Sequence, residues 1–194
     1  MLFSADKFKN LPVMSLQTGS ELARTSRAVI NPHDLSIVAY ELEGRLLDEH
    51  PSLLRIADIR EIGPMGMIVD SADELIGVGD VLQIEKIYKI KFDLIGLKVI
   101  DERKRTVGRV IGYTLEAGNF IIQQIRVKRP FFRSLGDTEF LIHRSQIVEV
   151  SDDYIVVKSP DIRHTEPVAN VDSKSFENPF RKSPQPHPES IDAS

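Results

Sequence analysis

The sequence contains no cysteine, only five histidines, and no apolar run long enough to cross a membrane. Without cysteine the chain can form no disulfide, has no thiolate nucleophile and offers no cysteine ligand to a metal. That composition suits a reducing compartment, and we expect a cytoplasmic protein. The first nine residues interrupt their apolar side chains with charge, so they lack the apolar core of a signal peptide. A spanning helix would need roughly 18 uncharged apolar residues in a row, so we expect no direct membrane insertion.

Catalytic patterns are also missing. The histidines at positions 33, 50, 143, 164 and 187 include no pair at the spacing of metal ligands on a helix, and His143 is expected in a barrel wall. The Gly77-Val-Gly79 segment lacks the third glycine and the following helix of a dinucleotide-binding loop. No nucleophile, base and orienting group can be assembled from the motifs present. We therefore predict that the protein is not an enzyme and holds no cofactor or metal.

Size and charge define what the chain can be. Its 194 residues, 41% of them hydrophobic, suffice for one medium domain or two small ones. The net charge of −4 is unevenly spread: residues 1–90 carry −5, residues 91–160 carry +3, and residues 161–194 carry −2. The segment 91–160 is therefore where an anionic partner would be electrostatically favoured.

Short apolar runs divided by turn residues begin at Leu11 and predict many short strands. The clearest hairpin joins Val107–Tyr113 to Phe120–Val127, with Gly118-Asn119 supplying the positive φ that a tight turn requires. Glycines 108 and 112 predict bulges or a close approach of two backbones. Residues 81–90 have an ambiguous period and predict a strand or short helix that packs the two halves of the chain together.

One small β unit is repeated. The segment Glu61–Ser71 can be laid over Glu149–Ser159 without a gap, and a glutamate, a turn, an apolar triplet and a serine fall in register 88 residues apart. A second similarity joins Arg24–Ile30 to Arg105–Ile111. These matches predict a tandem duplication.

The run Asp101-Glu-Arg-Lys-Arg-Thr-Val-Gly-Arg-Val-Ile111, the hairpin after it, Ile142-His-Arg-Ser-Gln-Ile147 and Asp153-Tyr-Ile-Val-Val157 together resemble a PRC-barrel domain. This family is named after the photosynthetic reaction-centre H subunit and includes the C-terminal domain of a ribosome maturation factor. The resemblance covers residues 91–160 and, more weakly, residues 11–75, where Ser26 and Pro64-Met-Gly66 depart from the pattern. It implies a small, strongly bent β barrel used as an interaction surface, and it brings no catalytic residues.

We therefore predict a mostly β protein with two tandem small PRC-type β-barrels and a disordered C-terminal tail. Residues 1–10 are predicted as a polar lead-in, 11–90 as a degenerate first barrel with its connector, and 91–160 as the second barrel. Residues 161–194 are polar and rich in proline, and such a composition cannot bury enough apolar area to offset the entropy of ordering.

Partner-binding residues are predicted in two places. Lys128, Arg129, Phe131, Phe132 and Arg133 surround Pro130 on a loop. They can stack on bases and neutralise phosphates, can present an aromatic anchor to a protein, or can simply cap the barrel with solvated cations.

In the tail, Phe176 and Phe180 suit a docking motif that orders on binding, although they can also fold back or have no role. The favoured function is a non-enzymatic adaptor that binds a protein partner. The alternatives are an RNA- or ribosome-associated maturation factor and a scaffold held at a membrane or division site by a membrane-bound partner. The oligomeric state is left open.

Overall fold

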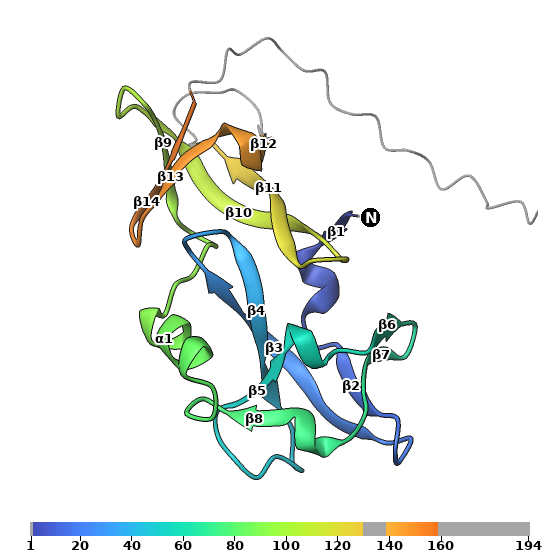
Figure 1. The fold of residues 1–194 in the computed structure, drawn as a ribbon. Helices are drawn as coiled ribbons and strands as arrows, with labels where there is room; N and C mark the ends of the chain where they lie inside the picture. Colours follow the sequence, from blue (N-terminus) through green and yellow to red (C-terminus); the bar gives the residue numbers. More distant parts are fainter. Residues whose placement is uncertain (1, 130–138, 159–194) are drawn as a thin grey trace, which may run out of the picture. The chain divides into compact units, whose positions relative to one another are not determined.

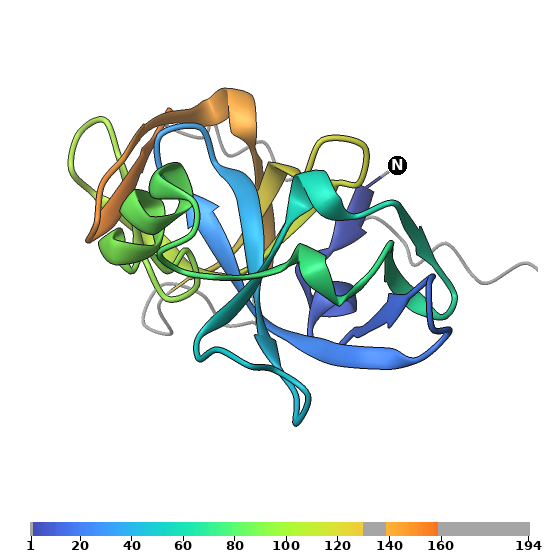
Figure 2. The same cartoon turned by 60° about the horizontal axis from the view of Figure 1, so that its bottom comes forward.

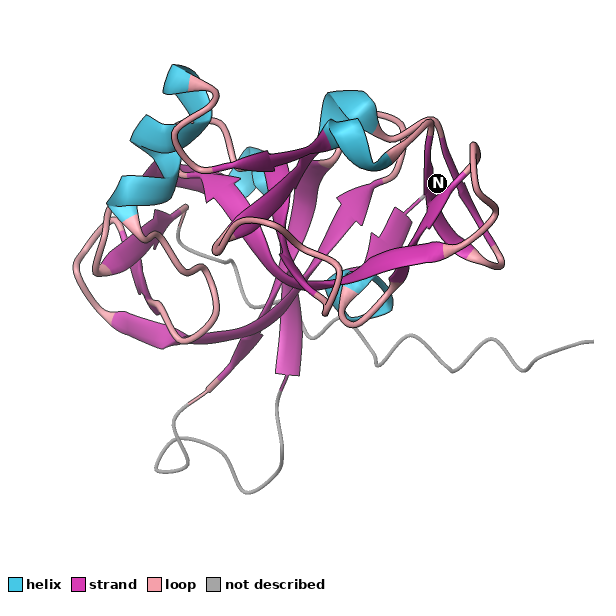
Figure 3. Cartoon of the chain, turned by 90° about the horizontal axis from the view of Figure 1, so that it is seen from below, coloured by secondary structure: helices cyan, strands magenta, loops and turns pink. Residues whose placement is uncertain are grey.

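The structure is a computed structural model that describes residues 2–129 and 139–158. Within these ranges the chain is mostly strand (Figure 3), and its strands join in a 14-stranded sheet with one α-helix, α1 (Leu82–Ile90). The predicted mostly β fold class is therefore confirmed. The predicted tail, residues 161–194, lies outside the described residues.

Six strands and a 3-10 helix form a unit that we call the first repeat. They are β2 (Pro12–Ser15), β3 (Glu21–Asn31), β4 (Ser36–Glu43), β5 (Ser52–Arg55), η2 (Ile56–Asp58), β6 (Glu61–Gly63) and β7 (Gly66–Val69). Strands β2 to β5 form one antiparallel succession, and β6 pairs antiparallel with β7. Strand β7 then lies parallel to β2, so the chain returns to the strand with which the repeat began (Figure 1).

The second repeat follows the same order. It consists of β9 (Lys98–Asp101), β10 (Thr106–Glu116), β11 (Ile121–Lys128), β12 (Glu139–His143), η5 (Arg144–Gln146), β13 (Ile147–Val150) and β14 (Tyr154–Val157). Strands β9 to β12 are antiparallel, β13 pairs with β14, and β14 lies parallel to β9. The same series of pairings thus occurs twice. Within the described residues no ladder joins β5 to β6 or β12 to β13, so strand pairing alone does not close either repeat into a barrel.

The structure supports one of the two sequence similarities. Gly66 and Tyr154 begin β7 and β14, which keeps the spacing of 88 residues between Glu61–Ser71 and Glu149–Ser159. The match of Arg24 to Arg105 is wrong, because Arg24 pairs with Pro12 near the start of β2, and the residue in that place in the second repeat is Arg109, which pairs with Lys98. The turn between the first two strands differs in length between the repeats, which a comparison without gaps cannot accommodate.

The two repeats meet where β4 and β11 begin, and these two strands pair antiparallel there. The Ile37 N–H donates to the Phe120 carbonyl at 2.9 Å, and the Ile122 N–H donates to the Leu35 carbonyl at 2.9 Å. Ile122 occupies the place of Ile37, and Phe120 that of Leu35. The joint is therefore reciprocal, as in a twofold-symmetric dimer interface, although it lies within one chain.

The prediction that Gly118-Asn119 supplies the positive φ of the hairpin turn is wrong. Positive φ is found at Phe120 (54°) and at its counterpart Leu35 (51°), and not at Gly118 or Asn119. The Phe120 N–H donates to the Glu116 carbonyl at 2.8 Å, so the left-handed residue is the last of the turn. Both side chains are buried, at 5% and 4% exposure, and this burial offsets the strain of a left-handed backbone.

The predicted roles of the two β10 glycines are confirmed. The pairing of β10 shifts register between Thr106 and Gly108 on one side and between Val110 and Gly112 on the other. A Cβ atom at position 108 would lie 2.4 Å from the Lys128 carbonyl oxygen. Gly108 therefore permits a close approach of β10 and β11 that no other residue allows.

The amino-terminal residues, predicted as a polar lead-in, are built into the fold. Strand β1 (Leu2–Ser4) pairs with β10 of the second repeat, and η1 (Ala5–Phe8) follows it. The Phe8 side chain is 3% exposed, and its ring centroid lies 6.1 Å from that of Tyr40 and 5.8 Å from that of Phe120. Phe8 thus joins side chains of both repeats, and one hydrophobic cluster includes residues from both.

The connector between the repeats contains η3 (Ala72–Glu74), β8 (Leu75–Gly77) and α1. Residues 81–90 were predicted as a strand or short helix packing the two units together. They form a helix, and its buried Ile84 packs with Val29, Ala39 and Leu53 of the first repeat. Strand β8 pairs with β5, which extends the first repeat by one strand. The helix thus contributes to the first repeat's own packing (Figure 2).

Candidate nucleic-acid interface

Three cationic side chains lie in one row across the second repeat. Arg109 on β10 pairs in register with Lys98 on β9 and with Lys128 on β11. Neighbouring strands are about 4.8 Å apart, so the row spans about 10 Å. On β12 the row ends at Glu139, which is in register with Lys128. Like charges directly opposite each other in a sheet repel, so Arg109 faces a like charge on each neighbouring strand.

A groove of about 420 Å³ lies over this row. Its seven lining residues are Lys98, Thr106, Gly108, Arg109, Ile111, Lys128 and Arg129. Four of these are cationic and none is acidic, so the groove concentrates positive potential in a protein whose net charge is −4. We call it the basic groove.

Arg129 is oriented by an aromatic ring at one end of the groove. Its guanidinium carbon lies 5.1 Å from the ring centroid of Phe140 on β12. A cation–π contact of this kind contributes about 0.5–1 kcal/mol at an exposed site. The contact holds the guanidinium beside the row of cations.

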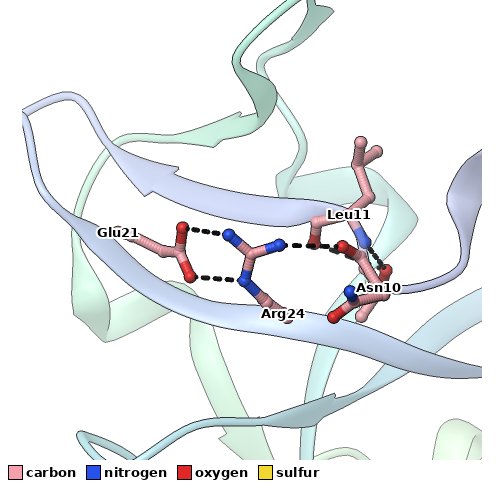
Figure 4. Close-up of polar contacts among 5 residues, drawn as sticks. Asn10, Leu11, Glu21 and Arg24 are labelled. Carbon is pink, nitrogen blue, oxygen red and sulfur yellow. Dashed lines mark hydrogen bonds and ion pairs between the residues drawn. The ribbon is translucent and has the colours of Figure 1, made fainter.

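The same row in the first repeat has a different charge pattern. Arg24 pairs in register with Pro12 on β2 and with Glu43 on β4. Its Nε and Nη2 atoms donate to the Glu21 carboxylate at 2.7 and 2.8 Å (Figure 4). Where the second repeat has lysine, arginine and lysine, the first has proline, a paired arginine and glutamate.

The arginine of each row also has a structural role. Arg24 Nη1 donates to the Asn10 carbonyl at 3.2 Å, and Arg109 Nη1 donates to the Gly96 carbonyl at 3.0 Å. Asn10 and Gly96 occupy equivalent places before the first strand, and both have positive φ, at 57° and 89°. The arginine therefore stabilises the entry to each repeat, whereas the lysines at positions 98 and 128 belong to the second repeat alone.

Two of the residues predicted for partner binding, Lys128 and Arg129, line the groove. Phe131, Phe132 and Arg133 of the same loop and Phe176 and Phe180 of the tail lie outside the described residues, and their roles stay predictions. Sequence reasoning missed Lys98 and Arg109. The available sequence signal is the match of Leu97-Lys-Val99 to Leu11-Pro-Val13, which places a lysine where the first repeat has a proline. The structure shows that the two segments are equivalent, because the Thr25 N–H donates to the Leu11 carbonyl and the Val110 N–H to the Leu97 carbonyl, both at 3.0 Å.

The turn that joins β9 to β10 is held by a buried carboxylate. Asp101 is 3% exposed and accepts hydrogen bonds from the Arg103 N–H at 2.9 Å, the Arg105 N–H at 2.8 Å and the Arg105 Nε at 2.6 Å. Burial raises the pKa of the Asp101 carboxyl, but the hydrogen bonds from Arg105 and Arg103 outweigh burial and hold that pKa below its ordinary value. The turn's three cations, residues 103–105, are exposed.

His143, expected in a barrel wall, is exposed at the end of β12. Its Nδ1 accepts from the Ser145 N–H at 3.2 Å, and its own N–H donates to Gln146 Oε1 at 3.0 Å. It therefore caps η5. Among residues 2–129 and 139–158 no group of three histidine, aspartate or glutamate side chains is placed to hold a metal ion.

No helix in the described part of the chain is long and apolar enough to cross a membrane. No protein-family model matches the chain, and no curated protein matches it in sequence. A solved structure, a putative 16S ribosomal RNA processing protein RimM from Pseudomonas aeruginosa, is similar to the chain at 18% identity, over 78% of each chain, with a TM-score of 0.27. A TM-score this low does not establish a shared overall arrangement.

Proposed function

We propose that this protein is a non-enzymatic RNA-binding factor built on two PRC-type repeats, and that the basic groove of the second repeat contacts the RNA backbone. The row Lys98–Arg109–Lys128 is the observation that carries the proposal. Phosphates bound along the row would offset the repulsion among these like charges. It would also release counterions, which is the main source of affinity in sequence-independent nucleic-acid binding.

Comparison of the repeats supports this function. Both have an arginine that donates to the residue two positions before the first strand, but only the second surrounds it with lysines. In the first repeat Glu21 and Glu43 lie beside Arg24, and their negative charges disfavour the binding of an anion there. The +3 charge of residues 91–160, against −5 for residues 1–90, points the same way.

The test measures the affinity of the full chain for a labelled single-stranded RNA of about 12 nucleotides, within the range of site sizes known for such proteins. Three or four phosphate contacts predict a slope of about −2 to −3 in log affinity against log salt. Affinity should therefore fall about 20- to 50-fold between 50 and 200 mM salt. The Lys98→Ala and Lys128→Ala variants should each reduce the slope by about 0.7.

The matched control is Arg24→Ala in the first repeat, compared with Arg109→Ala in the second. Both variants lose the same bond to a backbone carbonyl, and Arg24→Ala also loses the Glu21 pair, so the control should be destabilised at least as much as Arg109→Ala. Only Arg109→Ala should weaken RNA binding. Equal effects of the two variants on binding, or no binding in 50 mM salt, would contradict the proposal. A DNA oligonucleotide of the same sequence that binds as tightly would show that the groove does not select RNA.

A further inference from the structure

A second surface of this protein is defined by a cleft that occurs twice. One copy lies between the β3–β4 turn and the segment Ile147–Val150, and has a volume of about 280 Å³. The other lies between the β10–β11 turn and Ile59–Ile62, the equivalent segment 88 residues earlier, and has a volume of about 790 Å³. The reciprocal joint between the repeats relates the two clefts.

The smaller cleft is bridged by a side chain that the larger one lacks. Arg144 Nη1 donates to the Asp34 carbonyl at 2.7 Å, so the guanidinium links the two walls. The residue 88 positions before Arg144 is Ile56, which has no donor on its side chain. The larger cleft therefore has no such bridge between its walls.

The larger cleft has apolar walls. The N-terminal segment contributes Phe3, Phe8 and Leu11 to one wall, and Ile59 and Ile62 lie on the other. Ile62 is 37% exposed. Beside the cleft, the tip of the β6–β7 hairpin carries Met65, which is 65% exposed, whereas the equivalent β13–β14 tip carries Asp153. The same hairpin is thus acidic at its tip in one repeat and apolar in the other.

The wall formed by Ile59–Pro64 includes a strand edge. Within residues 2–129 and 139–158, β6 pairs with β7 alone and ends the path of the sheet. The N–H and C=O groups of such an edge can pair with an added strand. The three residues of β6 restrict any addition to a short segment. An apolar cleft beside an open edge is the combination that recognises an extended peptide, with the edge binding its backbone and the cleft its alternate side chains.

The charges around the cleft indicate the character of that peptide. Arg60 forms an ion pair with Asp70 at 2.6 Å. The other charged residues that line the cleft are Lys7 and Glu61, whose opposite charges sum to zero. An uncharged segment fits this rim better than an acidic or a basic one. The cleft thus differs from the basic groove in both position and chemistry.

We propose that this cleft binds an extended, uncharged segment of a protein partner, with apolar side chains at alternate positions, as an added strand on β6. This site is independent of RNA binding at the basic groove. Together the two would let one chain hold a protein and an RNA at the same time.

The experiment selects heptapeptides from a random display library on the full chain, with counter-selection on Ile62→Lys. The expected result is an enriched family with apolar residues at alternate positions and no net charge. A synthetic peptide of that sequence should bind at least tenfold more weakly to Ile62→Lys than to the wild type, and with little change between 50 and 200 mM salt. Val150→Lys, the equivalent change at the smaller cleft, should leave binding unaltered.

Several results would overturn the proposal. No enriched sequence, equal enrichment on both proteins, or peptides dominated by acidic residues would each do so. Backbone amide shifts measured by NMR on peptide addition should centre on residues 59–63, and shifts centred elsewhere would refute strand addition. Concentration-dependent self-association that Ile62→Lys abolishes would identify a second copy as the occupant. If Ile62→Lys lowers the melting temperature, Ile62→Thr serves as the milder variant under the same criteria.

Discussion

Leu35 and Phe120 have the same left-handed backbone, the same burial and the same hydrogen-bonding role in two copies of one unit. The Leu35 carbonyl accepts a hydrogen bond of 2.9 Å from the Ile122 N–H, and the Phe120 carbonyl accepts one of the same length from the Ile37 N–H. Left-handed conformations are unfavourable for such side chains by roughly 1–2 kcal/mol each. The joint between the repeats therefore depends on two strained turns that the surrounding core holds in place.

Truncation of Phe120 should destabilise both repeats together. Phe120→Ala is expected to lower the free energy of unfolding by about 3–5 kcal/mol, because the ring packs in the shared cluster. Urea denaturation followed by tyrosine fluorescence and by circular dichroism should show one transition with both probes. The exposed Leu82→Ala serves as control and should change stability by no more than about 0.5 kcal/mol. Two separate transitions would show that the repeats fold independently.

The backbone strain at Phe120 can be isolated by a second substitution. Phe120→Gly and Phe120→Ala both remove the ring, but only glycine adopts a φ of 54° without strain. We expect Phe120→Gly to be more stable than Phe120→Ala by about 1 kcal/mol, the reverse of their order at an ordinary strand position. The same denaturation experiment measures the difference, and a less stable glycine variant would contradict the left-handed turn.

Gly108 should tolerate no side chain. In Gly108→Ala the new methyl group would lie 2.4 Å from the Lys128 carbonyl oxygen, and separating β10 from β11 should cost about 1–3 kcal/mol. Gly118→Ala is the matched control, because a Cβ there meets nothing within 4 Å, and it should change stability by less than about 1 kcal/mol. Thermal unfolding of the three proteins tests this prediction, and it fails if both variants behave alike.

Asp101 should make stability depend on acid pH. Because its folded pKa is lowered, its contribution is present above the unfolded pKa of about 3.9 and is lost as pH falls through the folded pKa. Asp101→Asn should be less stable than the wild type at pH 7, and the two should converge as the pH is lowered. Urea midpoints across the acid range provide the measurement. The exposed neighbour Glu102→Gln is the control, and an Asp101→Asn difference that is the same at every pH would refute the prediction.

Tyr113 should act at alkaline pH with the opposite sign. Burial, followed by the nearby Asp93 and Asp6 carboxylates, raises the pKa of Tyr113 to about 12, against about 10 in the unfolded chain. Its contribution to stability is complete below the unfolded pKa and is lost as pH rises through the folded pKa. Tyr113→Phe should therefore lose less stability than the wild type above about pH 10. Phenolate absorbance should lack the step near pH 12 in this variant, and an unchanged titration would assign that step elsewhere.

The sequence predicts the second repeat better than the first, for a physical reason. In the second, alternating apolar residues flank a turn whose glycine and asparagine mark it clearly, and β10 and β11 lie where the pattern places them. In the first, the equivalent turn Asn31–Leu35 contains no glycine and is marked less clearly. Residues 81–90 fit a strand or a helix in sequence, and only the packing of Ile84 on β3 and β4 decides between them.

Other features depend on contacts that no local pattern encodes. The amino-terminal segment alternates charge with Phe3 and Phe8, and such a short run predicts nothing until β10 and the aromatic cluster are available as partners. The basic groove is built from three strands, so Lys98 and Arg109 become neighbours of Lys128 only through the registers of β9, β10 and β11. The sequence alone therefore identified Lys128 and Arg129, at the loop, and missed Lys98 and Arg109 on the neighbouring strands.

The joint at Leu35 and Phe120 consists of hydrogen bonds between main-chain groups, and those groups are the same whatever side chains stand on the outer faces of the strands. Because side chains on the outer faces do not enter this joint, each outer surface can differ in charge without loosening the pair. One copy could exchange an acid for a lysine at the position of Glu43 and Lys128, while the other could exchange an aspartate for a methionine at its hairpin tip. The symmetry of the backbone is what made the asymmetry of the surfaces possible.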